Sequence, residues 1–173
     1  MKLKIANKKM PQIQLLDASK AQQIIKRMAY EIYEHNIDEK EITLIGIQER
    51  GVDIAYLLQK EIEAISKLKI ISTSIEMDKT NPLNPIIIDK IKMANKNIII
   101  VDDVANSGKT VLYAMKTLLN EIPKKIQVAV LIDRKHKQFP ISSDFVGMQI
   151  STTIKENIKV IVEKGQIVSA ILE

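Results

Sequence analysis

Apolar residues recur along this chain with two different spacings, and the first is that of a helix. Between residues 24 and 32 they repeat every three to four positions, the period of one buried helix face. Asp17 or Ser19 could cap this helix, and we expect it to end near His35. The same spacing returns over residues 52–65, so the pattern predicts a second helix there.

Continuous apolar runs between the helices predict buried strands. These strands are expected over residues 42–47, 68–75, 97–101 and 125–132. The other expected elements are a short return strand over 85–88, a helix over 109–120 and a closing hairpin over 158–162 and 166–172. Strands that alternate with helices need crossover connections, which implies an α/β fold with a mostly parallel, twisted sheet flanked by helices.

Three of the predicted strands end in unusual polar turns, which follow Ile47, Val101 and Ile132. In a parallel sheet, ligands bind beyond the carboxyl ends of the strands, where the strand order reverses. If these three strands are neighbours, their turns therefore converge on one ligand site.

Length and composition limit the class of protein. The 173 residues suit a single domain spanning 1–173, and 46% apolar with 27% charged residues is typical of a globular chain. The absence of cysteine excludes disulfides, thiolate metal sites and a cysteine nucleophile, and it fits a reduced, cytoplasmic setting. Because the apolar runs are short, we expect neither a membrane span nor a targeting signal.

The net charge is +5, from 26 Lys and Arg against 21 Asp and Glu. Lysine accounts for 23 of these cations and is spread along the chain, which is typical of a solvated surface. Charge alone is therefore weak evidence for an RNA or DNA partner. The three arginines, Arg27, Arg50 and Arg134, are more informative because they are scarce.

The strand over 97–101 leads into the most specific chemical signal in the chain. Two adjacent carboxylates, Asp102 and Asp103, follow it, and a loop of small residues then opens a helix. Backbone N–H groups at a helix start bind anions, and the hydroxyls of Ser107 and Thr110 suit a phosphate. The carboxylates would repel that phosphate unless a ribose lay between them. Its vicinal hydroxyls would then meet the carboxylates, directly or through Mg²⁺, while the loop holds its 5′-phosphate.

Two other interpretations share part of this pattern. A P-loop needs a glycine five positions before Gly108, where this chain has Asp103, so a P-loop is excluded. The structural alternative is an acidic strand end followed by an ordinary capped helix. Two acids alone would leave that alternative open. The full run of an apolar strand, two acids and Asn-Ser-Gly-Lys-Thr favours a ligand site.

The run over 97–110 resembles the ribose-5-phosphate signature of type I phosphoribosyltransferases. The stretches 21–36, 45–51 and 129–147 are similar to one branch of that family, the bacterial pyrimidine operon attenuation proteins and uracil phosphoribosyltransferases. Nearly the whole chain follows this pattern, with 76–91 as the exception. The resemblance implies the type I phosphoribosyltransferase fold, with a small hood and a C-terminal β-hairpin, and a homodimer or a higher homo-oligomer.

Members of this family transfer ribose 5-phosphate from 5-phosphoribosyl 1-diphosphate (PRPP) to a nucleobase with Mg²⁺, and the resemblance favours uracil. It implies that Asp102 and Asp103 are catalytic and hold the ribose hydroxyls or Mg²⁺. Arg50, also catalytic, would neutralise the diphosphate. Phe145 would stack on the base, and the backbone near Val146 would read its edge. The substrate-binding residues that it implies are Arg50, Gly51, Asp102, Asp103, Ala105, Asn106, Ser107, Gly108, Lys109, Thr110, Arg134, Phe145 and Val146.

Two segments near the expected site depart from the family pattern. Asn106 stands where the related 6-oxopurine enzymes have an acid that serves as general base. Because an amide cannot take a proton there, Asn106 argues against a hypoxanthine or guanine enzyme. The mobile loop after the second core strand lacks the family's Tyr and Arg over 74–80, and Lys79 is its only substitute cation.

The first helix keeps Arg27 but has Lys26 and Tyr30 where the family uses Thr and His to recognise messenger RNA.

Three functions stay open. The first is an active phosphoribosyltransferase, which we rank highest. The second is an RNA-binding pyrimidine attenuation regulator that senses a nucleotide in the same pocket. The third is a catalytically weak nucleotide-binding module with a poor lid.

Overall fold

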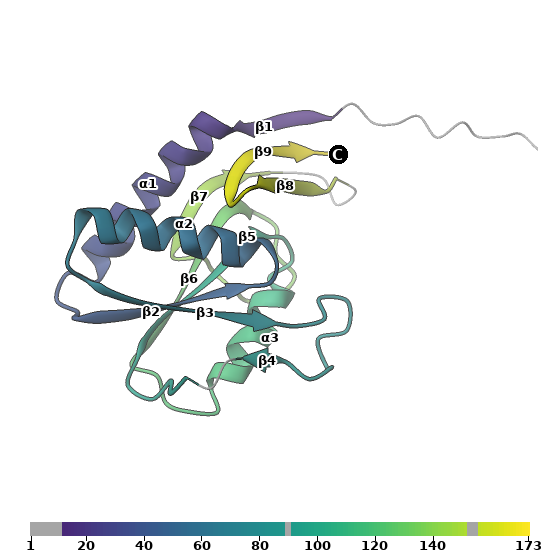
Figure 1. Ribbon diagram of the computed structural model, residues 1–173. Coiled ribbons are helices and arrows are strands. Elements are labelled where there is room, and N and C mark those ends of the chain that lie inside the picture. The colour runs from purple at the N-terminus through teal and green to yellow at the C-terminus, as the bar shows by residue number, and fades with distance from the viewer. Residues whose placement is uncertain (1–11, 89–90, 152–155) are drawn as a thin grey trace, which may run out of the picture.

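Figure 1 shows the computed structural model, which describes residues 12–88, 91–151 and 156–173. Within these residues the larger sheet has six strands in the order β4-β3-β2-β5-β6-β7. Neighbouring strands are parallel except for β3 and β4, which are antiparallel. The strands span Glu41–Ile47 (β2), Lys69–Glu76 (β3), Ile87–Ile88 (β4), Asn97–Ala105 (β5), Lys125–Arg134 (β6) and Phe145–Ile150 (β7).

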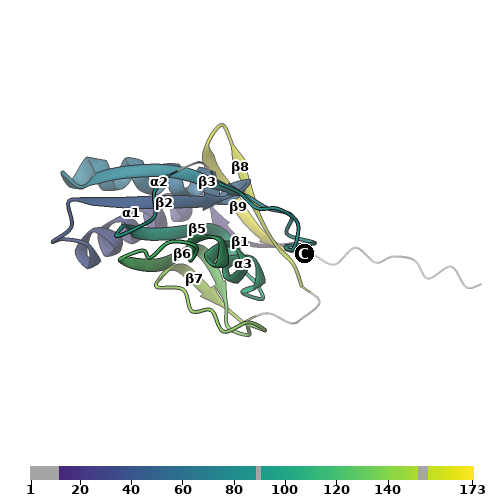
Figure 2. The same ribbon diagram turned by 90° about the horizontal axis from the view of Figure 1, so that it is seen from below.

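The described part of the chain has three helices, which span Ala18–His35 (α1), Arg50–Ile65 (α2) and Lys109–Leu118 (α3). Helices α1 and α2 pack on one face of the larger sheet and α3 packs on the other, as the view in Figure 2 shows. Side chains alternate along β5 to serve both layers, since Ile99 belongs to the α1–α2 core while Ile98 and Ile100 belong to the α3 core. None of these helices is long and apolar enough to cross a membrane.

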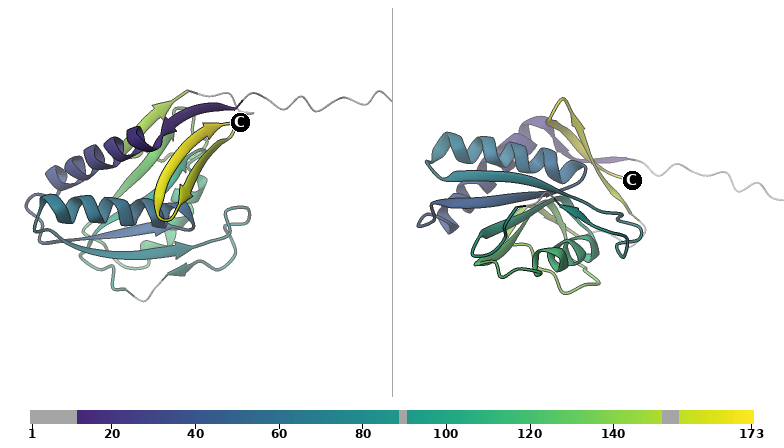
Figure 3. Two further views of the ribbon diagram at one scale, coloured as in Figure 1. Left: turned by 45° about the horizontal axis from the view of Figure 1, so that its top comes forward. Right: turned by 60° about the horizontal axis from the view of Figure 1, so that its bottom comes forward.

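A second, antiparallel sheet forms the predicted hood and C-terminal hairpin. Its order is β1-β9-β8, with strands over Ile13–Asp17 (β1), Ile158–Glu163 (β8) and Gln166–Leu172 (β9). Both views of Figure 3 show it beside α2, and β8 contacts α2 and β5. The turn between β8 and β9 holds Lys164 and Gly165 in the left-handed conformation, at φ of 51° and 72°, which suits a two-residue hairpin.

The predicted helices and core strands are present, and the cap of α1 is Asp17. Its side chain accepts a hydrogen bond from the backbone N–H of Lys20 at 2.8 Å. Two strands, β1 and β7, were not predicted. The segment that forms β7 was expected only to cover the base, but it pairs in parallel with β6 and extends the sheet.

The strand predicted over 97–101 continues to Ala105, which changes the environment of the two acids. Its pairing with β6 runs on through Asp102↔Val130 and Val104↔Ile132. Asp102 and Asp103 therefore lie within the strand, not in a turn after it, and both are buried.

The strand order confirms that the three polar turns converge. β2, β5 and β6 are adjacent, and the order reverses between β2 and β5, because the chain passes outward from β2 to β3 before it crosses back to β5. A crevice at such a reversal is the usual ligand site of an open α/β sheet.

The start of α2 is pressed against β5 at Gly51. A Cβ atom placed there would lie 2.5 Å from the carbonyl oxygen of Val101, well inside van der Waals contact. Only glycine allows the helix to begin this close to the strand that carries the acids.

Gly51→Ala is therefore expected to lower the free energy of unfolding by about 1–3 kcal/mol, because the added methyl group must displace α2. Urea denaturation measures the change. The control is Gly165→Asn, which adds a side chain where nothing lies within 4 Å and where asparagine tolerates the left-handed backbone. Its effect should stay within about 0.5 kcal/mol. Equal effects at both positions would contradict the close approach.

Candidate active site

An open cleft of about 440 Å³ lies where β2, β5 and β6 end. It brings together six of the predicted site residues, namely Arg50, Asp102, Asp103, Asn106, Thr110 and Arg134. The loop after β3 adds Lys79, and the segment around β8 and the end of β9 adds Asn157, Ile158, Lys159 and Glu173. These last four residues were not predicted, because no motif marks a surface that forms only when the hood folds over the sheet.

The two acids lie side by side on β5, each with its own basic partner. The Lys79 ammonium nitrogen is 3.4 Å from Oδ1 of Asp102, and Nη1 of Arg50 is 3.8 Å from Oδ2 of Asp103. The Asp102 carboxylate also accepts a hydrogen bond from the backbone N–H of Asp103 at 3.0 Å. Two cations from different elements thus converge on two adjacent carboxylates.

The pKa of Asp102 is raised to about 7, chiefly by burial; the nearby charge of Lys79 lowers this pKa and that of Asp103 raises it. The residue is only 2% exposed, so its charged form has lost most of its hydration. A carboxyl group with a pKa this perturbed, at the base of a cleft, is typical of a functional site.

The loop between β5 and α3 has a fixed shape. Gly108 has φ of 82°, a conformation that other residues rarely adopt. The carbonyl oxygen of Ser107 accepts hydrogen bonds from the backbone N–H groups of Gln138 and Phe139, at 3.1 and 3.0 Å. No side chain caps α3 through its N-cap residue, Gly108. Its first turn therefore presents the positive end of the helix dipole to this loop, as an anion site requires.

The residues predicted to hold a phosphate have different positions in this loop. Asn106 and Thr110 line the cleft, whereas Ala105 is buried. Ser107 and Lys109 are half-buried, and the Ser107 hydroxyl accepts a hydrogen bond from the Lys109 backbone N–H at 3.3 Å. A phosphate bound at this loop would therefore contact its backbone more than these side chains.

Arg50 is the first residue of α2, directly after the turn that ends β2. The peptide bond between Gln48 and Glu49 in this turn is cis, and no side-chain hydrogen bond from Glu49 caps the helix. Gly51 is buried and does not line the cleft, so the structure gives it a packing role. Arg50, 42% exposed in its side chain, follows this turn and lines the cleft.

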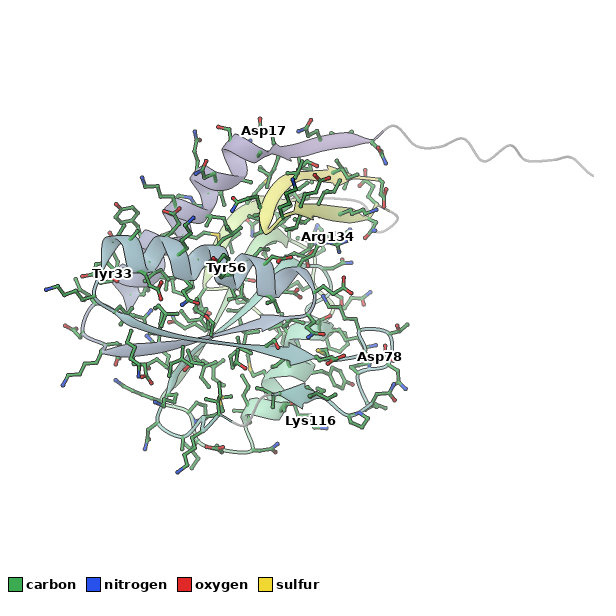
Figure 4. The ribbon with its side chains drawn as sticks, viewed as in Figure 1. Asp17, Tyr33, Tyr56, Asp78, Lys116 and Arg134 are labelled. Atoms are coloured by element: carbon green, nitrogen blue, oxygen red, sulfur yellow. The ribbon has the colours of Figure 1, made fainter. Side chains whose placement is uncertain are left out.

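Arg134 ends β6 and reaches back to the loop after β5. Its guanidinium donates a hydrogen bond to the side-chain oxygen of Asn106. Figure 4 labels Arg134 beneath the small sheet. Asp133, beside it, accepts hydrogen bonds from Lys137 and from the Ser143 hydroxyl, so it stabilises the turn after β6.

The structure corrects the roles predicted for Phe145 and Val146. Phe145 is 1% exposed and lies in the core under α1, with its ring edge-on to His35 at a centroid distance of 5.3 Å. The carbonyl oxygen of Val146 accepts a hydrogen bond from Arg27 at 3.0 Å. Because β7 continues the sheet, these residues serve its packing, and neither lines the cleft.

The acid pair fits a magnesium ion that is shared with a substrate. Among the residues described, no cluster of three or more His, Cys, Asp or Glu side chains could hold a metal. Mg²⁺, however, is commonly bound by one or two carboxylates together with substrate phosphates, and it keeps several waters. Asp102 and Asp103 supply hard oxygen donors of the required type at the base of the cleft.

Paired acids, two facing cations and the start of a helix thus meet in one cleft at a strand reversal. The chain belongs to the phosphoribosyl transferase domain family, whose profile matches residues 11–163. It is similar to the bifunctional protein PyrR of Leuconostoc mesenteroides, with 34% identity over 90% of this chain and 94% of that protein. The PyrR of Clostridium novyi is 37% identical, over 87% and 90% of the two chains.

Solved structures support the same fold. The hypoxanthine phosphoribosyltransferase of Trypanosoma cruzi superposes with a TM-score of 0.75 at 17% identity, covering 90% of this chain and 94% of that one. A hypoxanthine-guanine phosphoribosyltransferase of Bacillus anthracis gives 0.73 at 22% identity, over 91% and 96%. At these identities the likeness concerns the fold alone.

The raised pKa of Asp102 predicts a stability change with pH. The folded chain holds this proton more tightly than the unfolded chain, whose aspartate titrates near 3.8. Stability is therefore lost as the pH rises from about 4 to about 7. Asp102→Asn carries no charge, so above pH 7 it should be more stable than the unsubstituted protein, by at most roughly 4 kcal/mol.

Urea unfolding at pH 4 and at pH 8 measures this difference. The gain should nearly vanish at pH 4, where the carboxyl group is protonated in the folded protein. A gain of the same size at both pH values, or no gain at either, would contradict the buried-carboxylate account.

Proposed function

We propose that this chain is a cytoplasmic phosphoribosyltransferase that transfers ribose 5-phosphate from PRPP to a nucleobase, with uracil as the preferred base, and releases diphosphate. The observation that carries the proposal is that Asp102, Asp103, Arg50 and the start of α3 all lie at one cleft. That arrangement matches a donor with a ribose, a 5′-phosphate and a diphosphate.

Each part of the donor has a complementary group. The backbone of the loop over 106–110 would hold the 5′-phosphate at the start of α3. The two carboxylates would accept hydrogen bonds from the ribose hydroxyls or hold Mg²⁺. Mg²⁺, when bound, would supply charge neutralisation at the diphosphate. Arg50, whose planar fork suits bidentate phosphate contacts, would face the leaving diphosphate.

The reaction depends mainly on the positioning of the two substrates and on charge stabilisation. The bond between C1 of the ribose and the diphosphate oxygen breaks early, which leaves positive charge on the ring while a ring nitrogen of the base approaches. Two carboxylates beneath the sugar would stabilise that charge, and the cations Arg50 and Lys79 would stabilise the departing diphosphate.

The identity of the acceptor rests on residue 106 and on the relatives. Asn106 donates and accepts hydrogen bonds but cannot act as a base, and its side-chain oxygen is engaged by Arg134. This supports a pyrimidine acceptor over a 6-oxopurine. Arg134 would then meet the base or the diphosphate, since it lines the cleft from the end of β6.

RNA binding is the second candidate function, because the relatives carry the name bifunctional protein PyrR. Pyrimidine-dependent attenuation would be that second activity. Arg27 is the residue of the first helix that this chain shares with the family pattern. It donates hydrogen bonds to the carbonyl oxygens of Val146 and Gly147 and pairs with Glu31. Its side chain is 46% exposed, so it both ties α1 to β7 and remains accessible.

Diphosphate release from PRPP, Mg²⁺ and uracil tests the proposed reaction. Asp103→Asn should lower kcat/KM by about 10²–10³-fold, because it removes a charge that faces the reacting ribose. The control is Asp38→Asn, an exposed acid in the turn after α1, which should leave the rate unchanged. Full turnover in Asp103→Asn would refute the assigned site.

Two further outcomes separate the alternatives. Binding of PRPP without release in the presence of uracil, cytosine, hypoxanthine or guanine would favour a regulator or a nucleotide-binding module without turnover. Release with a purine but not with uracil would overturn the pyrimidine assignment and keep the enzyme.

A further inference from the structure

The loop between β3 and β4 places Lys79 beside Asp102, the more buried of the two acids. Nζ of Lys79 lies 3.4 Å from Oδ1 of Asp102. The Asp102 side chain is 3% exposed, whereas that of Lys79 is 43% exposed. One partner is therefore fixed in the floor of the cleft, and the other reaches it from a surface loop.

This loop has a defined shape of its own. The carboxylate of Asp78, labelled in Figure 4, accepts hydrogen bonds from the backbone N–H groups of Thr80 and Asn81, at 2.8 and 3.0 Å. It also accepts one from the side-chain amide of Asn84 at 2.9 Å. The residue next to Lys79 is thus held in a defined turn within the loop.

The contact has an electrostatic reason. A carboxylate with so little exposure has lost most of its hydration, and a cation within 4 Å restores part of that loss. The neighbouring acid, Asp103, adds a repulsive charge and has Arg50 at 3.8 Å on its other side. Lys79 is the basic group that faces Asp102 directly in the described part of the chain.

We propose that Lys79 is the resident counter-ion of Asp102 and competes with a divalent cation for this carboxylate until substrate binds. The inference rests on the proposed function, in which Asp102 and Asp103 hold Mg²⁺. In the free protein the Lys79 ammonium group lies against the carboxylate that would hold the metal. The metal would therefore bind weakly without PRPP and would enter together with it.

Substrate removes the conflict. PRPP carries a diphosphate that can accept the Lys79 ammonium, and this frees the Asp102 carboxylate for a ribose hydroxyl or the metal. Lys79 would then set when the acid becomes available, and it would contact the diphosphate once substrate is bound.

Binding of Mn²⁺ to the free protein tests this inference, with electron paramagnetic resonance counting unbound Mn²⁺ in the absence of PRPP and nucleobase. At a pH well above the pKa of Asp102, Lys79→Met, which keeps the length of the side chain without its charge, should bind Mn²⁺ roughly tenfold tighter, since a unit charge within 4 Å is removed. Lys79→Arg keeps the charge and should bind like the unsubstituted protein.

The matched control is Lys116→Met, which removes the same charge from an exposed position on α3, labelled in Figure 4 away from Arg134. Its Mn²⁺ affinity should not change. Equal affinities for the unsubstituted protein and Lys79→Met would overturn the inference. An equal gain in Lys116→Met would overturn it as well, because the effect would then come from net charge alone.

This measurement is independent of turnover. Tighter Mn²⁺ binding by Lys79→Met, in a protein that releases no diphosphate with any base, would support the counter-ion and refute the proposed enzyme. Unchanged Mn²⁺ binding, in a protein that turns over with uracil, would refute the counter-ion and support the enzyme.

Discussion

The parallel ladder between β5 and β6 continues past Val101, and the whole cleft depends on this continuation. Because Asp102 and Asp103 are held in a paired strand, their carboxylates have fixed positions and little water around them. Burial of the Asp102 carboxyl group raises its pKa. Cations from two other elements lie close to the two acids. The buried charge that destabilises the folded chain is thus concentrated in the cleft, where a bound ligand would compensate it.

Close packing around this strand sets the distances between the parts of the site. Glycine at position 51 lets α2 start against the Val101 carbonyl, and this brings Arg50 within 3.8 Å of Asp103. Just beyond the carboxyl end of β5, Gly108 turns the chain in the left-handed conformation, and the segment over 138–139 fixes that turn through the Ser107 carbonyl. The Arg50 side and the α3 side of the cleft are therefore both built on the backbone of β5 and the loop that follows it.

The sequence predicted the parts of the fold that follow from local pattern. Periodicity identified the helices and core strands, and the polar turns after Ile47, Val101 and Ile132 indicated one convergent site, which the strand order confirms. The predictions were wrong where pairing between distant strands decides the secondary structure. The ladder with β6 extends β5 through two acids that a pattern assigns to a turn, and it makes a strand of the segment that holds Phe145. The hood residues beside the cleft carry no local signal, and Lys79 was the one cation that loop composition alone indicated.

A structure of the protein crystallised with uridine 5′-monophosphate tests the central claim most directly, since this nucleotide is the product of the proposed reaction. We expect the 5′-phosphate at the backbone N–H groups of residues 106–110 and the ribose hydroxyls facing Asp102 and Asp103. A nucleotide bound elsewhere, or bound in the cleft with its phosphate away from the start of α3, would contradict it.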